Sequence, residues 1–158
     1  MKRISMKALL CAALIAILAL APVSALAANT VQIYIVKING ARLRTGANRT
    51  TVVTSLKKGQ RVVYAGRHDG AMYYVRTAGG RTGYIYKEYL KPYGAATRSQ
   101  IFKTTRRTTM YRNRGSGHLR TLSKGTTVIV YQRKGQWAYI KTLRGTSGYV
   151  KLSSIQRA

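Results

Sequence analysis

Short alternating runs of apolar and polar residues occupy the chain after its first 30 residues. In VQIYIVKI, the side chains of Val31, Ile33 and Ile35 alternate with those of Gln32 and Tyr34. Six further runs are rich in β-branched and aromatic residues: RVVYAG, MYYVR, TGYIY, TTVIVYQR, WAYIK and SGYVK. A period of two over such short runs is typical of β-strands, and no run after the first 30 residues keeps a helical period. The pattern therefore predicts an all-β barrel or sandwich.

Several of these runs recur in the second half of the chain, in the same order. SLKKGQRVVY at 55–64 matches TLSKGTTVIV at 121–130, at a spacing of 66 residues. At a spacing of 65, GAMYYVRT matches GQWAYIKT and GGRTGYI matches RGTSGYV. We therefore expect the second copy to lack one residue of a loop that the first copy has between Tyr64 and Gly70.

The recurrence predicts two copies of one small domain. We place the first copy at 31–92 and the second at 104–156, with a short linker at 93–103 that contains Gly94 and two alanines. Each copy has 50 to 60 residues, so burial alone gives it marginal stability. Closing each sheet into a barrel would remove exposed strand edges and help such a small core.

Glycines at matching positions of the two copies have predictable roles. Gly59 and Gly125 follow a lysine at a hairpin turn, where a positive φ is needed. The leucine before each turn and the valine after it are expected to face one core. Gly83 and Gly148 each precede a tyrosine in the last long strand, where a missing side chain lets two strands approach closely.

These motifs resemble those of the bacterial SH3 domains, often called SH3b. That family has an N-V-R-x-G opening, an x-L-x-K-G-x-x-V hairpin, a G-W-x-K-V strand and a G-x-x-G-W/Y-V close. The first copy has RLRTG, SLKKGQRV, GAMYYV and GRTGYI, and the second has TLSKGTTV, GQWAYI and GTSGYV. The resemblance implies an all-β chain of two small SH3-like β-barrels in tandem. It also implies a binding module for peptidoglycan or its cross-bridge peptides, of a kind often attached to hydrolases.

The chain departs from the family pattern at two places. Met72 stands where the family has tryptophan, whereas the second copy keeps Trp137. The opening motif of the second copy, TTMYRNRGSG at 108–117, can be aligned in two registers. A groove built around the family tryptophan is therefore expected to differ between the copies.

The first 27 residues have the pattern of a secretory signal peptide. Basic residues precede an apolar run at 8–21, and an A-L-A cleavage box ends at Ala27. The apolar run is shorter than the ~20 residues that span a bilayer, and an uncleaved anchor is the alternative. The only cysteine, Cys11, lies in this segment, so the mature chain would have no disulfide. We expect a secreted protein associated with the cell envelope.

The charge of the chain is strongly one-sided. There are 29 Lys and Arg residues against two acidic residues, which gives a formal net charge of +27. Three of these cations lie in the predicted signal peptide, so +24 would remain after cleavage. The basic residues are spread through strands and turns, which predicts a charged folded surface that attracts polyanions.

The sequence offers little for catalysis. The two acids are Asp69 and Glu88, and the two histidines are His68 and His118. Zinc sites need three or four ligands, and no Ser–His–acid arrangement or phosphate-binding loop recurs between the copies. We therefore expect no enzymatic activity, no metal and no cofactor.

Tyrosines beside basic residues are the stronger candidates for function. All twelve tyrosines follow residue 30, and such pairs can stack on sugars or bases and capture anions. The plain alternative is that Tyr74, Tyr84, Tyr139 and Tyr149 fill or edge the core. The binding residues expected by analogy and face assignment are Arg42, Arg44, Tyr73, Tyr86, Tyr111, Arg112, Trp137 and Lys141.

Together these features predict an exported, noncatalytic binding protein, which we expect to be a monomer. Its expected partners are cell-wall peptidoglycan or an anionic, teichoic-acid-like wall polymer. Extracellular nucleic acid is the alternative partner, because small basic β-barrels with exposed aromatic residues bind phosphate chains.

Overall fold

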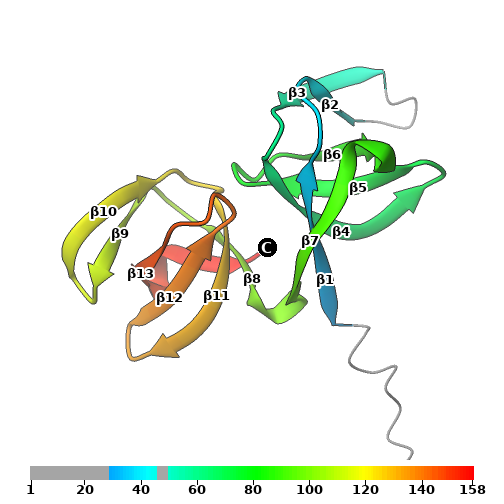
Figure 1. Ribbon diagram of the computed structural model, residues 1–158. Coiled ribbons are helices and arrows are strands. Elements are labelled where there is room, and N and C mark those ends of the chain that lie inside the picture. Colours follow the sequence, from blue (N-terminus) through cyan, green and yellow to red (C-terminus); the bar gives the residue numbers. More distant parts are fainter. Residues whose placement is uncertain (1–28, 46–49) are drawn as a thin grey trace, which may run out of the picture.

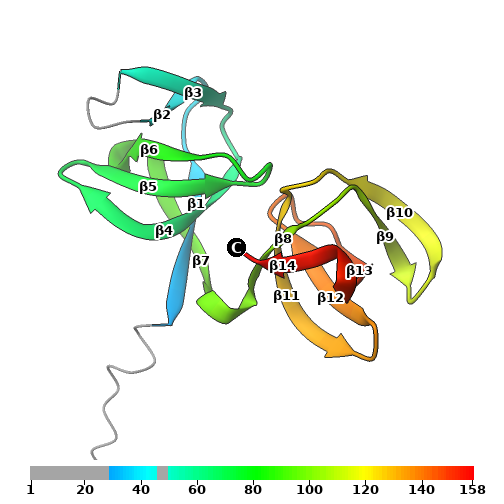
Figure 2. The same ribbon diagram turned by 180° about the vertical axis from the view of Figure 1, so that it is seen from behind.

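The computed structural model describes residues 29–45 and 50–158, which form two antiparallel sheets of seven strands each (Figures 1 and 2). The predicted signal peptide, with Cys11, and Gly46 of the opening motif lie outside the described residues. No α-helix occurs in the described ranges, and the predicted all-β fold class is confirmed. The two sheets lie side by side, with the C-terminus between them in both views.

The first sheet belongs to residues 30–97, which we call the first unit. Its strands are β1 (Thr30–Val36), β2 (Ala41–Thr45), β3 (Thr51–Leu56), β4 (Arg61–Asp69), β5 (Met72–Thr77), β6 (Thr82–Tyr86) and β7 (Leu90–Thr97). A short 3-10 helix, η1 (Lys87–Tyr89), precedes β7. The strand order in space is β3-β2-β6-β5-β4-β1-β7.

The second sheet belongs to residues 101–157, which we call the second unit. Its strands are β8 (Ile101–Thr104), β9 (Thr108–Asn113), β10 (Ser116–Leu122), β11 (Thr127–Lys134), β12 (Trp137–Thr142), β13 (Ser147–Lys151) and β14 (Ile155–Arg157). The 3-10 helix η3 (Leu152–Ser154) precedes β14. The order β10-β9-β13-β12-β11-β8-β14 repeats that of the first unit strand for strand.

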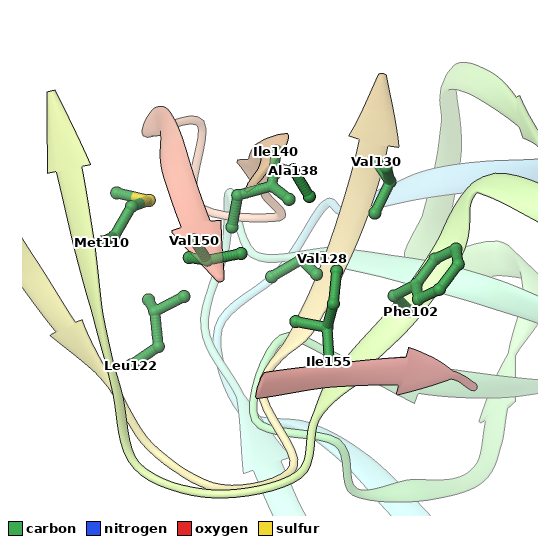
Figure 3. Close-up of a cluster of buried hydrophobic side chains, with 9 residues drawn as sticks. All are labelled: Phe102, Met110, Leu122, Val128, Val130, Ala138, Ile140, Val150 and Ile155. Carbon is green, nitrogen blue, oxygen red and sulfur yellow. The ribbon is translucent and has the colours of Figure 1, made fainter. Parts of the chain in front are cut away.

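Each sheet is bent around one hydrophobic core. In the second unit the core takes side chains from all seven strands, from β10 at one end of the sheet to β14 at the other (Figure 3). These residues are Phe102, Met110, Leu122, Val128, Val130, Ala138, Ile140, Val150 and Ile155. The core of the first unit is built likewise from Val36, Ala41, Leu43, Leu56, Val62, Val75, Ile85 and Leu90. Burial at both ends of an open strand order requires the sheet to curl.

The turns at Gly59 and Gly125 have the predicted glycine conformation, but they are not hairpin turns, because β3 and β4, and likewise β10 and β11, are not neighbours in their sheets. Gly59 and Gly125 have φ values of 85° and 83°, in the left-handed region that favours glycine. The Gly59 amide donates to the carbonyl of Val36 at the end of β1. The Gly125 amide donates to the carbonyl of Thr104 at the end of β8, and both distances are 2.9 Å. The two units therefore repeat at the level of single hydrogen bonds.

The one-residue difference between the copies lies in a β-bulge rather than in a loop. In the first unit the pairing of β4 with β5 shifts between Tyr64 and Arg67, which leaves Ala65 and Gly66 out of register. In the second unit the pairing of β11 with β12 shifts between Val130 and Gln132, and only Tyr131 is out of register. A bulge absorbs the extra residue without moving the strands on either side.

The segment expected to be a linker is largely strand. Residues 93–97 continue β7, which pairs with β1 along its whole length, and residues 101–103 begin β8. Between them lies only the 3-10 helix η2 (Arg98–Gln100). Thr97 and Gln100 form a capping box, in which the Thr97 amide donates to Oε1 of Gln100 at 2.9 Å. The connection between the units is therefore short and hydrogen-bonded.

A third hydrophobic cluster joins the two units, and we call it the seam. It consists of Val31, Ile33, Val63, Ala96, Ile101, Ile129 and Leu143, with the half-buried Ala78 packed against it. Strand β4 faces its own core with Val62 and the seam with Val63, and β11 does the same with Val128 and Ile129. These strands are buried on both faces, which explains their consecutive apolar residues.

The first prediction concerns Gly83 and Gly148. A Cβ at either position would lie 2.6 Å from a backbone carbonyl oxygen of the neighbouring strand, that of Arg44 or of Tyr111. We expect Gly83→Ala and Gly148→Ala each to lower the free energy of unfolding by about 2 kcal/mol or more, because backbone cannot move aside. Thermal unfolding followed by circular dichroism measures this. The control is Gly94→Ala in β7, where a Cβ would meet nothing within 4 Å; equal losses at all three positions would contradict the account.

The second prediction tests the seam. Gly80 and Gly59 share a φ of 85°, so alanine costs about 1 kcal/mol of backbone strain at either. A Cβ at Gly80 would also collide with the carbonyl of Gly125 in the other unit, whereas at Gly59 it would meet nothing within 4 Å. We expect Gly80→Ala to increase the radius of gyration in small-angle X-ray scattering and Gly59→Ala to leave it unchanged. The same radius for both variants would show that the seam does not hold the units together.

Candidate ligand-binding faces

A pair of tyrosines stands on the outer face of the second unit. Because side chains alternate along a strand, Ala138 and Ile140 of β12 enter the core and Tyr139 between them points outward. Tyr149 of β13 lies opposite Tyr139 in the sheet register. Their ring centroids are 5.1 Å apart at an interplanar angle of 54°, which is a favourable tilted contact.

The first unit carries the same pair at the equivalent positions. Tyr74 of β5 and Tyr84 of β6 have ring centroids 4.9 Å apart at 57°. The Tyr74 hydroxyl donates to Oγ1 of Thr82 at 3.0 Å, which fixes the position of the ring. Both pairs are half-buried, so each leaves part of an aromatic surface open to solvent.

A basic hollow lies beside the pair in the second unit. Trp137 precedes Tyr139 by two residues on the same face of β12 and packs edge-on against Tyr111, with centroids 5.7 Å apart at 89°. Nζ of Lys151 lies 6.0 Å from the tryptophan ring centroid. The hollow is lined by Arg114, Gln132, Lys134, Trp137, Tyr139 and Tyr149. Aromatic surface and cationic side chains therefore meet at one place.

The equivalent place on the first unit has different chemistry. Met72 occupies the position of Trp137 and is buried, with 2% of its surface exposed. Arg44 occupies the position of Tyr111, since Arg44 pairs with Tyr84 as Tyr111 pairs with Tyr149. The guanidinium of Arg67 lies 5.9 Å from the ring centroid of Tyr74. The two faces share a tyrosine pair and differ in what surrounds it.

Part of the predicted site residues meet on these faces. Tyr111 and Trp137 are in contact, and Arg112 is exposed in β9 next to Tyr111. Arg44 is half-buried beside Tyr84, and its Nη1 donates to the carbonyl of Thr50 at 3.5 Å. Because Tyr111 pairs with Tyr149 as Arg44 pairs with Tyr84, Tyr111 of the second opening motif corresponds to Arg44 of the first.

The other predicted residues lie elsewhere. Arg42 is exposed on β2, and Tyr86 is exposed and packs edge-on against Tyr89 with centroids 5.7 Å apart. Lys141 is half-buried in a hollow between the units that Arg61 and Tyr131 also line. These residues stay predictions, and they do not form one site with the tyrosine pairs.

Tyr73 packs against the core of the first unit, on the side of β5 opposite Tyr74. Its ring contacts those of Tyr34 and Tyr64, at centroid distances of 5.3 and 5.0 Å. Burial, followed by the hydrogen bond and the charge interaction with Tyr73, raises the pKa of Tyr34 to about 12. Nζ of Lys87 lies 5.3 Å from the Tyr73 ring centroid. The Tyr34 hydroxyl therefore stays protonated at physiological pH, and Tyr34 and Tyr73 both pack against the core of the first unit.

The four tyrosines of the outer pairs were expected to fill or edge the core. Strand alternation instead places each pair on the outer face of its sheet. Trp137 and Tyr139 are two residues apart and share that face of β12. Counting the period of two from Ile140, which is buried, gives this result.

Titratable groups are scattered over the surface. His68 lies 3.5 Å from the hydroxyl of Tyr64, and His118 is exposed in the other unit. Within 29–45 and 50–158, His, Cys, Asp and Glu side chains nowhere gather in a group of three that could hold a metal ion. None of the helices in these ranges has the length and apolar character that a membrane span requires.

Comparison with known proteins finds a family model that matches part of the first unit. A family model described as the bacterial SH3 domain matches residues 39–91. A search of the curated proteins found no match. Among solved structures, NlpC2 and NlpC1 from Trichomonas vaginalis are each 17% identical, with TM-scores of 0.35 and 0.36.

These structures are longer proteins. The matches cover 81% and 82% of this chain and 48% and 47% of the two Trichomonas vaginalis chains, so this chain spans about half their length. The family match covers β2 to β6 and the tyrosine pair of the first unit. The part of the chain that matches the bacterial SH3 domain is therefore residues 39–91, which is less than half of its length.

Proposed function

We propose that this protein is an exported, noncatalytic binding protein that holds cell-wall polymers on the outer faces of its two units. The observation that carries this proposal is the tyrosine pair, which recurs in both units with cations around it. These tyrosines are not among the side chains that form the two cores. Their repetition on both units is therefore better explained by a ligand.

The chemistry of the faces suits peptidoglycan. Tyrosine and tryptophan rings present flat apolar surfaces on which sugar rings and peptide planes pack. Arginine and lysine beside them bind the carboxylates of the wall peptides. The second unit, with Trp137, Tyr111 and the basic hollow, offers the larger aromatic surface. We propose it as the stronger of the two binding faces.

We further propose that residues 31–92 and 104–156 are two copies of one domain. The identical strand order and the matching turn hydrogen bonds of the two units support this. Two binding faces on one chain raise the affinity for a repeating polymer by a factor on the order of 10²–10⁴ when both engage. Export by a cleaved signal peptide at 1–27 would bring a monomer to such a polymer.

Extracellular nucleic acid is a second candidate ligand, which the net charge of +27 favours. Long-range attraction to phosphates depends on charge alone and weakens steeply with salt. Stacking of sugars or peptides on the faces depends on shape and survives moderate salt. Salt dependence therefore separates the two candidates.

The third prediction uses the only tryptophan, Trp137, as a reporter. Because it lies in the proposed face, soluble peptidoglycan fragments should change its fluorescence emission. We expect Trp137→Ala to weaken binding to purified cell walls about 5- to 10-fold in a pull-down. The matched control is Tyr131→Ala, which removes an aromatic residue that is 55% exposed on β11, outside the face.

Walls stripped of anionic polymers by acid, and duplex DNA, complete the experiment across a salt series. We expect wall binding to survive stripping and moderate salt. Loss of wall binding on stripping, with equal affinity for DNA and equal effects of the two substitutions, would contradict the proposal.

A further inference from the structure

The seam brings together equivalent surfaces of the two units. Val63 and Ile129 are 66 positions apart and hold the same place in β4 and β11. Ala78 and Leu143, 65 positions apart, hold the same place in the loops after β5 and β12. Each unit therefore offers the same loop and the same strand to the other, in the manner of a two-fold interface.

One of these two equivalent contacts is close-packed. The loop after β5 in the first unit lies against the turn between β10 and β11 of the second unit, with Gly80 next to the carbonyl of Gly125. The Thr127 amide donates to the carbonyl of Ala78 at 2.9 Å. The Thr127 hydroxyl donates to the carbonyl of Thr77 at 3.0 Å and is buried.

The equivalent contact, between the turn after β3 of the first unit and the loop after β12 of the second, is more open. Arg61 begins β4 where Thr127 begins β11, and its side chain is far larger. A Cβ on Gly145, the counterpart of Gly80, would lie 3.4 Å from Nη1 of Arg61, rather than against the backbone of the opposite turn. A cleft of about 540 Å³ lies between the turn after β3, the loop after β5 and the loop of the second unit that holds Leu143.

The lining of the cleft is strongly basic. It contains five cationic side chains and no carboxylate: those of Lys57, Lys58, Arg61, Arg81 and Arg144. Four come from the first unit and Arg144 comes from the second, so the cationic set is complete only when the seam holds. Five like charges in one cleft repel one another, and a bound anion relieves that repulsion.

Several of these cations are held in place by neighbours other than acids. Arg61 lies over the ring of Tyr93, 4.1 Å from the guanidinium carbon to the ring centroid. Nη1 of Arg81 donates to the carbonyl of Val53 at 3.3 Å. The backbone of the turn is fixed by the amide of Lys58, which donates to Oδ1 of Asn39 at 2.9 Å. Donors positioned before binding lose less entropy when a ligand arrives.

We propose that this cleft is a binding site for a phosphate chain that carries no bases. Arginine forks and lysine ammonium groups are the side chains that bind phosphate oxygens. A cleft with five separate cations matches successive phosphates better than a single anion. No aromatic ring is among the lining residues, so nucleobases would find no surface to stack on. A flexible polyol-phosphate wall polymer and inorganic polyphosphate share the required chemistry.

This proposal rests on the proposed function, because it names an anionic wall polymer as a ligand alongside peptidoglycan. The two kinds of site would bind different parts of the cell wall. The tyrosine faces would hold sugar and peptide, and the cleft would hold the phosphate chain. The sites share none of their lining residues, so each can be removed without the other.

The fourth prediction compares two triple variants with the same loss of charge. Lys57→Gln, Lys58→Gln and Arg144→Gln remove three exposed cations of the cleft. Lys91→Gln, Arg107→Gln and Arg157→Gln remove three exposed cations outside the cleft and the faces. The probes are sodium polyphosphate, a glycerol-phosphate oligomer and single-stranded DNA of equal phosphate number, titrated by calorimetry in a salt series.

We expect the cleft triple to bind the preferred phosphate chain roughly 30-fold more weakly than the unchanged protein, and the control triple to lose about 3-fold at most. The slope of log affinity against log salt should fall by about 2 in the cleft triple, near 0.7 for each lost contact. Because all six residues are exposed, both triples should unfold at the temperature of the unchanged protein, which circular dichroism checks.

The probes then separate the sources of the ligand. Cleft-dependent binding of the glycerol-phosphate oligomer identifies a polyol-phosphate polymer, and cleft-dependent binding of polyphosphate alone identifies the inorganic chain. Equal losses in the two triples, or DNA bound as tightly through the same cations, would overturn the cleft site. Such a failure differs from a failure of the proposed function, which would be the absence of wall binding in the unchanged protein.

Discussion

Burial of the apolar seam is the interaction on which the rest of the structure depends. Each unit is small and has one core of eight or nine buried side chains, so it gains limited stability by folding alone. The only cysteine is Cys11, at a position before both units, so no disulfide can supplement these cores. The seam adds a third cluster from both units and lets β4 and β11 bury both of their faces. Two marginal units thereby become one body whose surfaces have fixed relative positions.

The seam also explains where binding surfaces can form. The seam buries side chains of β1 and β4 in the first unit and of β8 and β11 in the second. The tyrosine pairs, on β5 and β6 and on β12 and β13, are not part of the seam. Equivalent parts of the two copies meet across it, yet the copies differ at Arg61 and Thr127. Buried hydrogen bonds of Thr127 close one contact of the seam, and a basic cleft lies beside Arg61. The cleft is lined by residues of both units, so neither unit has it alone.

Much of the fold could be predicted from the sequence, because it depends on turns and strand contacts that short sequence motifs encode. Gly59 and Gly125 mark turns, Gly83 and Gly148 mark close strand approaches, and the spacing of the motifs gives the repeat. The seam could not be predicted in this way. The alternation of Val31 and Ile33 shows a buried face, but it does not show that the partner is the other unit. Tyr73 was expected to bind a ligand, but its ring packs against Tyr34 and Tyr64 from other strands of its own unit. The cleft around Arg61 and Arg144 was missed because it joins residues more than 80 positions apart.

Because the seam is buried between them, residues 30–97 and 101–157 are expected to move as one body in solution. Residual dipolar couplings of backbone amides, measured on the weakly aligned protein, test this most directly. The seam predicts that the couplings of both units fit a single alignment tensor when the coordinates are used together. Two tensors of different orientation or magnitude would show that the units tumble separately, and the cleft between them would then have no fixed form.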